Sequence, residues 1–215
     1  MITDVPAFIR ANTRICTPPH VPQVKLHLAD DAVALWQMTE DELERIGLPP
    51  PFWAFAWAGG QALARHVLDH PEIVRGKIVL DVASGSGLVG IAAMQAGAAE
   101  AHCADIDGFA AYAALLNARL NDVALTATDA DPLQDDPDAD VILVGDLFYD
   151  RDIATRLLAW LRRQSARGLD ILVGDPGRSY LPKDALEQVA EYAVPTTKML
   201  EDAEVKRTGV WRLRA

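Results

Sequence analysis

The feature that most constrains the fold is a regular alternation of strand-like and helix-like segments that begins near Lys77. Strands are expected at residues 78–82, 101–104 and 123–127, with helices between them at residues 88–95 and 109–120. Strands joined by a helix pair in parallel, because a parallel neighbour needs a crossover connection. The segment therefore predicts an α/β fold built on a parallel sheet.

The C-terminal part of the chain continues this pattern and then departs from it. We expect strands at residues 141–144 and 169–173, a helix between them at 153–163, and a short helix at 183–189. Two extended segments, residues 193–200 and 205–213, leave no room for a crossover helix and are expected to pair antiparallel. The prediction is a seven-stranded, mostly parallel sheet with a C-terminal antiparallel hairpin and helices on both faces.

The beginning of the chain is rich in proline, which excludes long helices. We expect residues 1–51 to form a Pro-rich N-terminal arm or cap, and residues 52–215 to form one domain. Within the arm, residues 24–28 alternate as a short strand does, and a capping pattern at residues 39–42 predicts the start of a helix. The arm is therefore predicted to carry only short elements.

The net charge of the chain limits the classes of partner that can be expected. Twenty basic and thirty-one acidic side chains leave a net charge of −11. A broad surface that follows nucleic-acid phosphates is therefore not expected. Such a field favours cationic ligands or a lysine-bearing partner protein.

Cysteines, histidines and hydropathy give no sign of a metal site, a disulfide framework or a membrane span. Cys16 and Cys103 are far apart, which predicts two free thiols in a reducing compartment. The five histidines show no metal-ligand spacing. No apolar run of about 20 residues occurs, and Asp4 and Pro6 interrupt the place of a signal peptide. We expect a cytoplasmic monomer that spans no membrane.

The strongest functional signal is a glycine-rich turn between the first predicted strand and helix. Gly85, Gly87 and Gly90 have the Gly-x-Gly-x-x-Gly spacing that lets a nucleotide approach the backbone. Asp105 lies 20 residues after Gly85, at the end of the next strand, where a carboxylate accepts hydrogen bonds from ribose hydroxyls. The arrangement predicts an adenosine-type ligand, with a turn that serves only packing as the alternative.

Two nucleotide classes share this spacing. In an NAD site the strand usually runs straight into the first glycine, whereas here Asp81 closes the strand and Ala83 and Ser84 precede Gly85. A carboxylate at this position attracts a cationic sulfonium and repels a pyrophosphate. A P-loop is disfavoured, since the chain has no Gly-x-x-x-x-Gly-Lys-Ser/Thr motif. The residues favour a sulfonium cofactor over NAD.

These motifs are similar to those of a known family. Residues 79–87 resemble the first motif of class I, seven-stranded S-adenosylmethionine-dependent methyltransferases, with Ala83 in place of the usual first glycine, and residues 105–107 resemble the second. The resemblance implies a Rossmann-like sheet and a cofactor at the carboxyl ends of its first three strands. It implies these cofactor-binding residues: Trp57, Asp81, Ser84, Gly85, Gly87, Asp105, Ile106 and Asp129. Asp129 matches the position that contacts the adenine amino group, whereas for Trp57 core packing is the alternative.

A narrower resemblance comes from Asp146 and Tyr149, which are similar to the Asp-x-x-Tyr signature after the fourth strand of certain protein-lysine methyltransferases. Together with residues 52–60 and 174–178, it most resembles electron transfer flavoprotein β-subunit lysine methyltransferases. This resemblance implies a protein-lysine N-methyltransferase that acts on that β subunit. Ribosomal protein L11 methyltransferases share the early motifs, but their Asn-Pro-Pro-Tyr type element is absent from this chain.

The two signature residues have chemical roles and structural alternatives. Asp146 would orient the entering lysine ammonium, and Tyr149 would close the pocket. The alternatives are an N-cap on the helix after the fourth strand for Asp146 and a surface aromatic for Tyr149. We expect the acidic surface around Asp146 to recognise a basic segment of the partner.

Four other functions stay open at this point. They are methylation of another protein such as ribosomal protein L11, methylation of a small amine, an NAD-dependent oxidoreductase, and a cofactor-binding module without turnover. The NAD enzyme differs from the others in its cofactor, and the module differs in its lack of turnover. Cofactor binding and activity assays therefore separate these classes.

Overall fold

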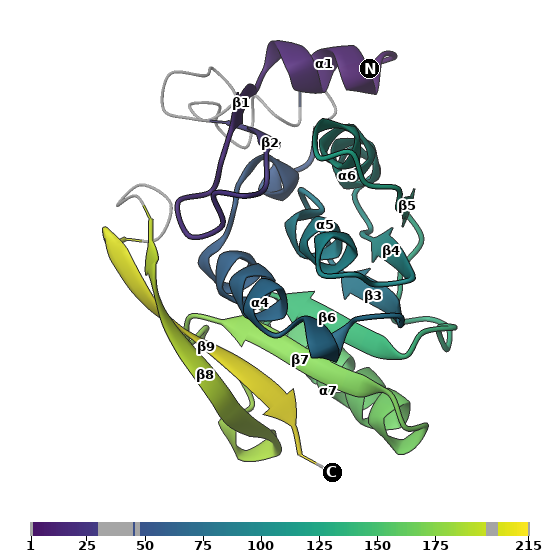
Figure 1. The fold of residues 1–215 in the computed structure, drawn as a ribbon, viewed down its shortest axis with the longest axis vertical. Helices are drawn as coiled ribbons and strands as arrows, with labels where there is room; N and C mark the ends of the chain where they lie inside the picture. Colours follow the sequence, from purple (N-terminus) through teal and green to yellow (C-terminus); the bar gives the residue numbers. More distant parts are fainter. Residues whose placement is uncertain (1, 30–44, 46–47, 197–201, 215) are drawn as a thin grey trace.

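A seven-stranded sheet forms the centre of the computed structural model, which describes residues 2–29, 45, 48–196 and 202–214 (Figure 1). Its strand order is β5-β4-β3-β6-β7-β9-β8. The parallel strands are β3 (Ile78–Val82), β4 (Glu100–Ala104), β5 (Thr126–Thr128), β6 (Val141–Gly145) and β7 (Asp170–Asp175). The strand β9 (Val205–Leu213) pairs antiparallel with both β7 and β8 (Leu186–Pro195). The predicted fold class is confirmed.

The direction of strand addition reverses beside β3. The chain moves outward from β3 through β4 to β5, then returns to place β6 on the other side of β3. In an open parallel sheet, ligands bind beyond the carboxyl ends of the strands at such a reversal. The ends of β3, β4 and β6 therefore mark the place to look for a site.

Helices cover both faces of the sheet (Figure 1). One face carries α4 (Ala58–Asp69), α5 (Leu88–Gln95) and α6 (Gly108–Leu120), and the opposite face carries α7 (Arg151–Ala166). Alternation along a strand supplies both cores, because successive side chains point to opposite faces. On β3, Val79 belongs to the buried hydrophobic cluster between the sheet and helices α4 and α5. Leu80, the next residue, belongs to a second hydrophobic cluster, between the sheet and α7.

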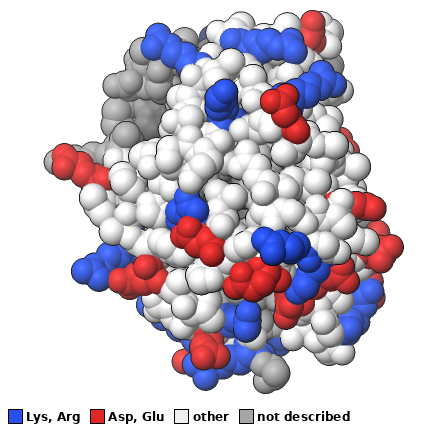
Figure 2. Space-filling view, viewed as in Figure 1, with Lys and Arg blue, Asp and Glu red and all other residues white. Residues whose placement is uncertain are grey.

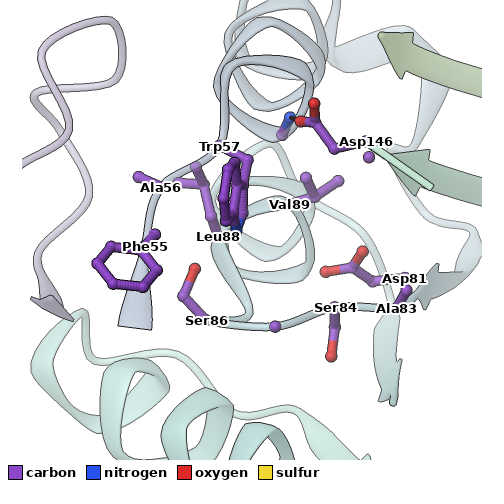
Figure 3. A pocket seen from close by; sticks show the side chains of 13 residues that line it. Phe55, Ala56, Trp57, Asp81, Ala83, Ser84, Ser86, Leu88, Val89 and Asp146 are labelled. Atoms are coloured by element: carbon purple, nitrogen blue, oxygen red, sulfur yellow. Dashed lines mark hydrogen bonds between the residues drawn. The ribbon is translucent and has the colours of Figure 1, made fainter. Parts of the chain in front are cut away.

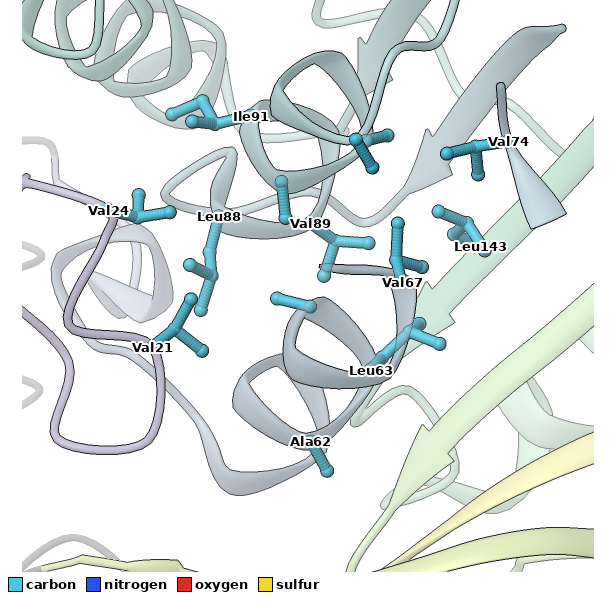
Figure 4. Close-up of a cluster of buried hydrophobic side chains, with 14 of the residues drawn as sticks. Val21, Val24, Ala62, Leu63, Val67, Val74, Leu88, Val89, Ile91 and Leu143 are labelled. Carbon is cyan, nitrogen blue, oxygen red and sulfur yellow. The ribbon is translucent and has the colours of Figure 1, made fainter. Parts of the chain in front are cut away.

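The N-terminal arm packs directly on the rest of the chain. It contains α1 (Val5–Ala11) and a two-stranded sheet of β1 (Arg14–Cys16) and β2 (Leu26–Leu28). Val21 and Val24 are fully buried in the same cluster as Leu88 of α5 (Figure 4). The backbone N–H of His27 donates to the side chain of Asn117 on α6 at 2.7 Å. Apolar burial and hydrogen bonds thus hold the arm against α5 and α6.

The structure confirms some predictions for the arm and adds elements to it. The predicted strand at residues 24–28 is β2, in shorter form, whereas α1 and β1 were not predicted. The carboxylate of Asp4 caps α1 by accepting a hydrogen bond from Ala7. The expected helix start at residues 39–42 lies outside the described residues.

The predicted short helix at residues 183–189 is wrong. Only a 3₁₀ turn, η3 (Lys183–Ala185), forms there, and the strand β8 starts at Leu186. The residues that follow are good helix formers, but Leu186, Glu187 and Gln188 pair with Leu213, Arg212 and Trp211 of β9. Sheet pairing has therefore overridden local propensity.

The predicted third strand at residues 123–127 is shorter and begins later, as β5. The end of α6 explains the shift: Asp122 adopts a left-handed φ of 54°, and Val123 donates back to the carbonyl of Ala118 at 3.2 Å. These features form a Schellman cap, in which the residues after the helix satisfy its last carbonyls. The cap includes Val123, which the sequence pattern assigned to the strand.

The acidic segment at residues 129–140 is mostly exposed, as expected, and it also contacts α7. The indole N–H of Trp160 donates to the carbonyl of Asp135 at 3.0 Å. Arg163 pairs with Asp136 at 2.9 Å, and Arg156 pairs with Asp131. The segment is thus a solvated connection that is held to α7 by hydrogen bonds and ion pairs.

The surface charge and the cysteines can be described directly. Basic and acidic side chains are interspersed on the face shown in Figure 2. Both cysteines are free, with Cys16 exposed and Cys103 buried. Within the described part of the chain, the helices lack the combination of length and apolarity that crossing a membrane requires.

Candidate active site

The glycine-rich turn connects β3 to α5 at the predicted place. Ala83 and Gly87 both have left-handed φ angles, 54° and 76°. A Cβ on Gly87 would lie 2.8 Å from the Cβ of Ala114, and one on Gly90 would lie 2.7 Å from the sulfur of Cys103. The last two glycines of the motif therefore let α5 pack closely on α6 and β4.

Asp81 lies near the end of β3 and is almost completely buried, with 1% of its surface exposed. Its carboxylate accepts a hydrogen bond from the backbone N–H of Gly90 at 2.8 Å. Burial raises the pKa of Asp81 to about 7; the Gly90 hydrogen bond opposes that shift and the nearby charge of Asp105 adds to it. A cationic group in contact with this carboxylate would stabilise its ionised form.

Asp105 follows β4 and is fixed by two backbone donors. Its Oδ2 accepts from the N–H of Gly85 at 2.9 Å, and its Oδ1 accepts from Asp107 at 3.0 Å. Burial raises the pKa of this carboxyl group, and the two hydrogen bonds oppose the increase. Ile106 is 73% exposed beside it. Asp129 follows β5 directly, so these three residues lie at the ends of two adjacent strands.

Asp146 follows β6 and has a left-handed φ of 56°. Its Oδ2 accepts from the backbone N–H of Gly60 at 3.0 Å, and its Oδ1 accepts from Nη2 of Arg178 at 2.7 Å. The N–H of Gly60 lies in the first turn of α4, where backbone donors have no acceptor within the helix. Asp146 therefore caps α4 from a distant part of the chain. The predicted alternative, a cap on the helix after β6, is wrong, because Asp150 caps α7.

A close approach of glycines places α4 over the strand ends. A Cβ on Gly59 would overlap the carbonyl oxygen of Gly174, and a Cβ on Gly174 would overlap the carbonyl oxygen of Gly59. A Cβ on Gly145 would lie 3.1 Å from the Cα of Gly60. The absence of side chains lets the start of α4 contact the ends of β6 and β7, which brings its N–H groups to Asp146.

Aromatic side chains form one rim of the site. The indole N–H of Trp57 donates to the carbonyl of Phe52 at 3.0 Å, and the guanidinium carbon of Arg178 lies 5.7 Å from the centre of a Trp57 ring. Tyr149 is 46% exposed, and its ring centre lies 6.0 Å from that of Phe52. Burial, followed by the charges of Asp150 and Asp105, raises the pKa of the Tyr149 hydroxyl. Tyr149 is thus partly exposed and in contact with the rim.

One cavity brings together several of the predicted residues: Trp57, Asp81, Ser84, Gly85 and Asp146. In Figure 3, Asp81 and Asp146 lie on one side of this cavity and Phe55 lies on the other. The remaining predicted residues do not line it: Gly87, Asp105, Ile106, Asp129 and Tyr149. Gly87 caps α5, Asp105 accepts the N–H of Gly85 in the turn, and Tyr149 lines a second cavity.

The structure also adds residues that the sequence analysis did not assign to the site. Phe55, Ala56, Gly60 and Gly145 line the cavity, and Arg178 holds Asp146. A close approach of two backbone segments could have been predicted from glycines, which stand at residues 59–60 and at the ends of β6 and β7. No local pattern indicates that Arg178 pairs with Asp146, since the two residues are 32 positions apart in the chain.

The donor set fits an adenosyl group that carries a positive charge. Asp81 provides a buried carboxylate beside the turn, and Asp105 provides a second at the end of the next strand. Two carboxylates would repel the pyrophosphate of a dinucleotide. Among the residues described, no group of three or more histidine, cysteine or acidic side chains could hold a metal ion.

Comparisons with known proteins point to methyltransferases. The family model for ribosomal protein L11 methyltransferase matches residues 62–147. The chain is 35% identical over 218 residues to the rat (Rattus norvegicus) electron transfer flavoprotein β-subunit lysine methyltransferase, covering 95% of this chain and 82% of the relative. It is 36% identical to the zebrafish (Danio rerio) protein of the same name, covering 97% and 83%.

Solved structures share the fold at low sequence identity. The magnesium protoporphyrin IX methyltransferase from Synechocystis PCC 6803, with bound S-adenosylhomocysteine (SAH), has a TM-score of 0.54 and 14% identity, covering 72% of this chain and 81% of that one. The ribosomal protein L11 methylase from Lactobacillus delbrueckii subsp. bulgaricus has a TM-score of 0.52 and 20% identity, covering 74% and 81%. These likenesses establish the architecture of the sheet and its helices.

Proposed function

The chain belongs to the electron transfer flavoprotein β-subunit lysine methyltransferase family, and we propose that it transfers methyl groups from S-adenosylmethionine to lysine side chains of that β subunit. The observation that carries the proposal is the shared cavity, in which Asp81 and the glycine-rich turn face the same space as Asp146. A cofactor subsite and an acceptor subsite thus adjoin each other. This arrangement suits an in-line transfer between two bound molecules.

The cofactor side of the cavity is made by the ends of β3 and β4. S-adenosylmethionine supplies an activated methyl group on a positively charged sulfur when it is bound. Asp81 would attract the cationic methionine end, and Asp105 would accept hydrogen bonds from the ribose hydroxyls while it holds Gly85. Ile106 and Asp129 extend this side toward the place expected for the adenine ring.

The acceptor side must provide a neutral amine. A free lysine has a pKa near 10.4, so holding the neutral form near pH 7 requires roughly 4–5 kcal/mol. Asp146 is placed to orient the incoming ammonium and to receive or pass on its proton. A carboxylate offers about four lone-pair sites, so its contacts with Gly60 and Arg178 are compatible with an ammonium partner. The ring of Tyr149 would close over the cation.

The first test concerns the cofactor. Calorimetric titrations with SAH and with NAD should show binding of the former alone. Tight binding of NAD would instead support an oxidoreductase.

The second test concerns the acceptor. The full-length enzyme is incubated with labelled S-adenosylmethionine and purified electron transfer flavoprotein, and in parallel with a lysate from cells that lack the enzyme. We expect label on lysines of the β subunit, located by mass spectrometry. Label on ribosomal protein L11, on a small amine or on RNA, with none on the β subunit, would contradict the proposed substrate.

A further inference from the structure

Asp146 faces the cavity of the candidate active site and is paired with a cation. Its carboxylate lines that cavity, whereas Arg178 lines the second one. Nη2 and Nε of Arg178 both donate to Oδ1 of Asp146, at 2.7 Å and 3.1 Å. The sequence led us to expect an acidic surface around Asp146, but the structure joins this carboxylate to a guanidinium group. Arg178 therefore reaches an acceptor in the site through Asp146.

The turn after β7 fixes the position of Arg178. Asp175, the last residue of β7, is fully buried, and its Oδ1 accepts the backbone N–H groups of Gly177 and Arg178, each at 2.7 Å. The guanidinium carbon of Arg178 lies 5.7 Å from the centre of a Trp57 ring. The side chains of Arg178 and Asp146 are only 21% and 8% exposed. Because water screens this pair weakly, its charges act strongly on a neighbouring charged group.

A carboxylate without a neighbouring cation would work against methyl transfer to lysine. The amine must first lose a proton, to Asp146 or to solvent. Its lone pair then forms the bond to the methyl carbon, while the carbon–sulfur bond breaks and its electron pair stays on sulfur. A full negative charge beside the lysine raises the pKa of its ammonium group and favours the protonated, unreactive form. A cation on the same carboxylate removes most of this unwanted effect.

We propose that Arg178 is a positioning residue that neutralises the charge of Asp146, so that the acceptor lysine enters methyl transfer as a neutral amine. This inference rests on the proposed function and assigns a residue to its acceptor side. Asp146 would orient the lysine nitrogen by accepting a hydrogen bond, while the Asp146–Arg178 pair carries no net charge. Asp175 would contribute by holding the backbone of Arg178 in place.

The closing experiment compares Arg178→Gln and Arg178→Lys with the control Arg65→Gln in the full-length enzyme. Arg65 donates to Asp69 at 3.0 Å on α4, and its side chain is exposed to a similar extent, 19% against 21%. It is not among the described residues that line either cavity. Single-turnover rates of methyl transfer to purified electron transfer flavoprotein are measured from about pH 6 to about pH 10.

The expected signature is a shift of the pH profile. In the wild type the rate should rise with pH to a plateau, as the bound lysine loses its proton. Arg178→Gln should raise the midpoint of this rise by about one pH unit, so that the rate falls about tenfold below the midpoint and recovers above it. Arg178→Lys keeps the charge and should keep the midpoint, with a lower plateau because the two-bond contact is lost. Arg65→Gln should match the wild type throughout.

Calorimetry without cofactor gives a second readout that needs no turnover. Near pH 7, Arg178→Gln should bind the flavoprotein about threefold more tightly than the wild type does, because Asp146 without the arginine attracts the lysine ammonium more strongly. Arg65→Gln makes the same change in net charge and should leave the affinity unaltered.

Two results would show that Arg178 only supports the fold and would overturn the inference: a rate that falls equally at every pH, or weaker binding by Arg178→Gln. A midpoint raised by about one pH unit in Arg178→Lys, whose charge is intact, would also overturn it, and this variant decides the question if the glutamine variant does not fold. In each case methylation by the wild type still stands. If the wild type methylates no lysine of the β subunit, the proposed function itself is overturned.

Discussion

Arg178 donates two hydrogen bonds to Oδ1 of Asp146, from Nη2 at 2.7 Å and from Nε at 3.1 Å. Oδ2 of the same carboxylate accepts the N–H of Gly60 at 3.0 Å. The two oxygens are therefore held by separate elements, the turn after β7 and the first turn of α4. The orientation of Asp146 is set by the fold before a substrate binds, which is the requirement for a residue that positions a reacting group.

The change Asp146→Asn should lower the kcat for methyl transfer about a hundredfold, because the amide cannot take up a proton and attracts an ammonium weakly. Its carbonyl can still accept the Gly60 hydrogen bond, so the fold should persist. Binding of SAH should change by less than about threefold, which is under 1 kcal/mol. Steady-state kinetics and calorimetry measure the two quantities.

Asp150→Asn is the matched control for this variant. It makes the same chemical change at the cap of α7, where asparagine caps as well as aspartate does. We expect normal kcat and normal unfolding for the control. A similar loss of kcat in both variants would remove Asp146 from the chemistry.

Tyr149→Phe should lower kcat about tenfold and preserve SAH affinity. The ring keeps its contact with Phe52, and only the hydroxyl group is lost. Tyr112→Phe is the control, since Tyr112 is exposed to a similar extent, 47% against 46%, on α6. Single-turnover rates compare the chemical step directly. If the Tyr149→Phe variant had the wild-type single-turnover rate, the hydroxyl group would have no role in methyl transfer.

The glycines at the start of α4 should respond oppositely to alanine. In Gly59→Ala the new methyl group would collide with the backbone of Gly174, so the free energy of unfolding should fall by about 1–3 kcal/mol. A Cβ on Gly60 meets no atom within 4 Å, and alanine favours a helix. Gly60→Ala should therefore raise the free energy of unfolding by up to about 1 kcal/mol. Urea denaturation measures both. Equal effects would contradict the close approach of α4 to β7.

Binding of SAH should depend on pH through Asp81. Its pKa is raised to about 7, so the carboxyl group is mostly neutral below that pH and mostly ionised above it. The ionised form attracts the α-ammonium group of SAH, so affinity should increase about tenfold between about pH 6 and about pH 8. Asp81→Asn should bind SAH weakly and lose most of this dependence. A wild-type affinity that stays constant across this range would show that Asp81 does not face the ligand.

The same group has a consequence for stability. Because folding raises the pKa of Asp81 from its usual 3.8 to about 7, the native state binds a proton that the unfolded state releases in this interval. The contribution of Asp81 to the free energy of unfolding should therefore decrease as pH rises from about 4 to about 7. Asp81→Asn should remove that decrease, and the variant should be more stable than the wild type at higher pH. Thermal unfolding in matched buffers tests the difference.

The central elements and the types of residue at their ends could be predicted from local patterns in the sequence. The strand at β3, the glycine-rich turn and the helix α5 are local patterns of apolar residues and glycines, so they could be recognised without the fold. Asp81, Asp105 and Asp146 each lie within two residues of the end of a predicted strand. Parallel strands bring their carboxyl ends to one edge, and for this reason the candidate site could be located in advance.

Which groups meet at that edge depends on contacts between segments that are distant in the chain. Arg178 pairs with Asp146 across 32 residues, and Gly60 reaches the same carboxylate across 86. The strand at Leu186, predicted as a helix, exists because β9 supplies its hydrogen bonds. Such contacts join residues whose separation in the chain leaves no periodic pattern. Their partners are selected by the packing of whole elements, and so the cap on α4 became visible only in three dimensions.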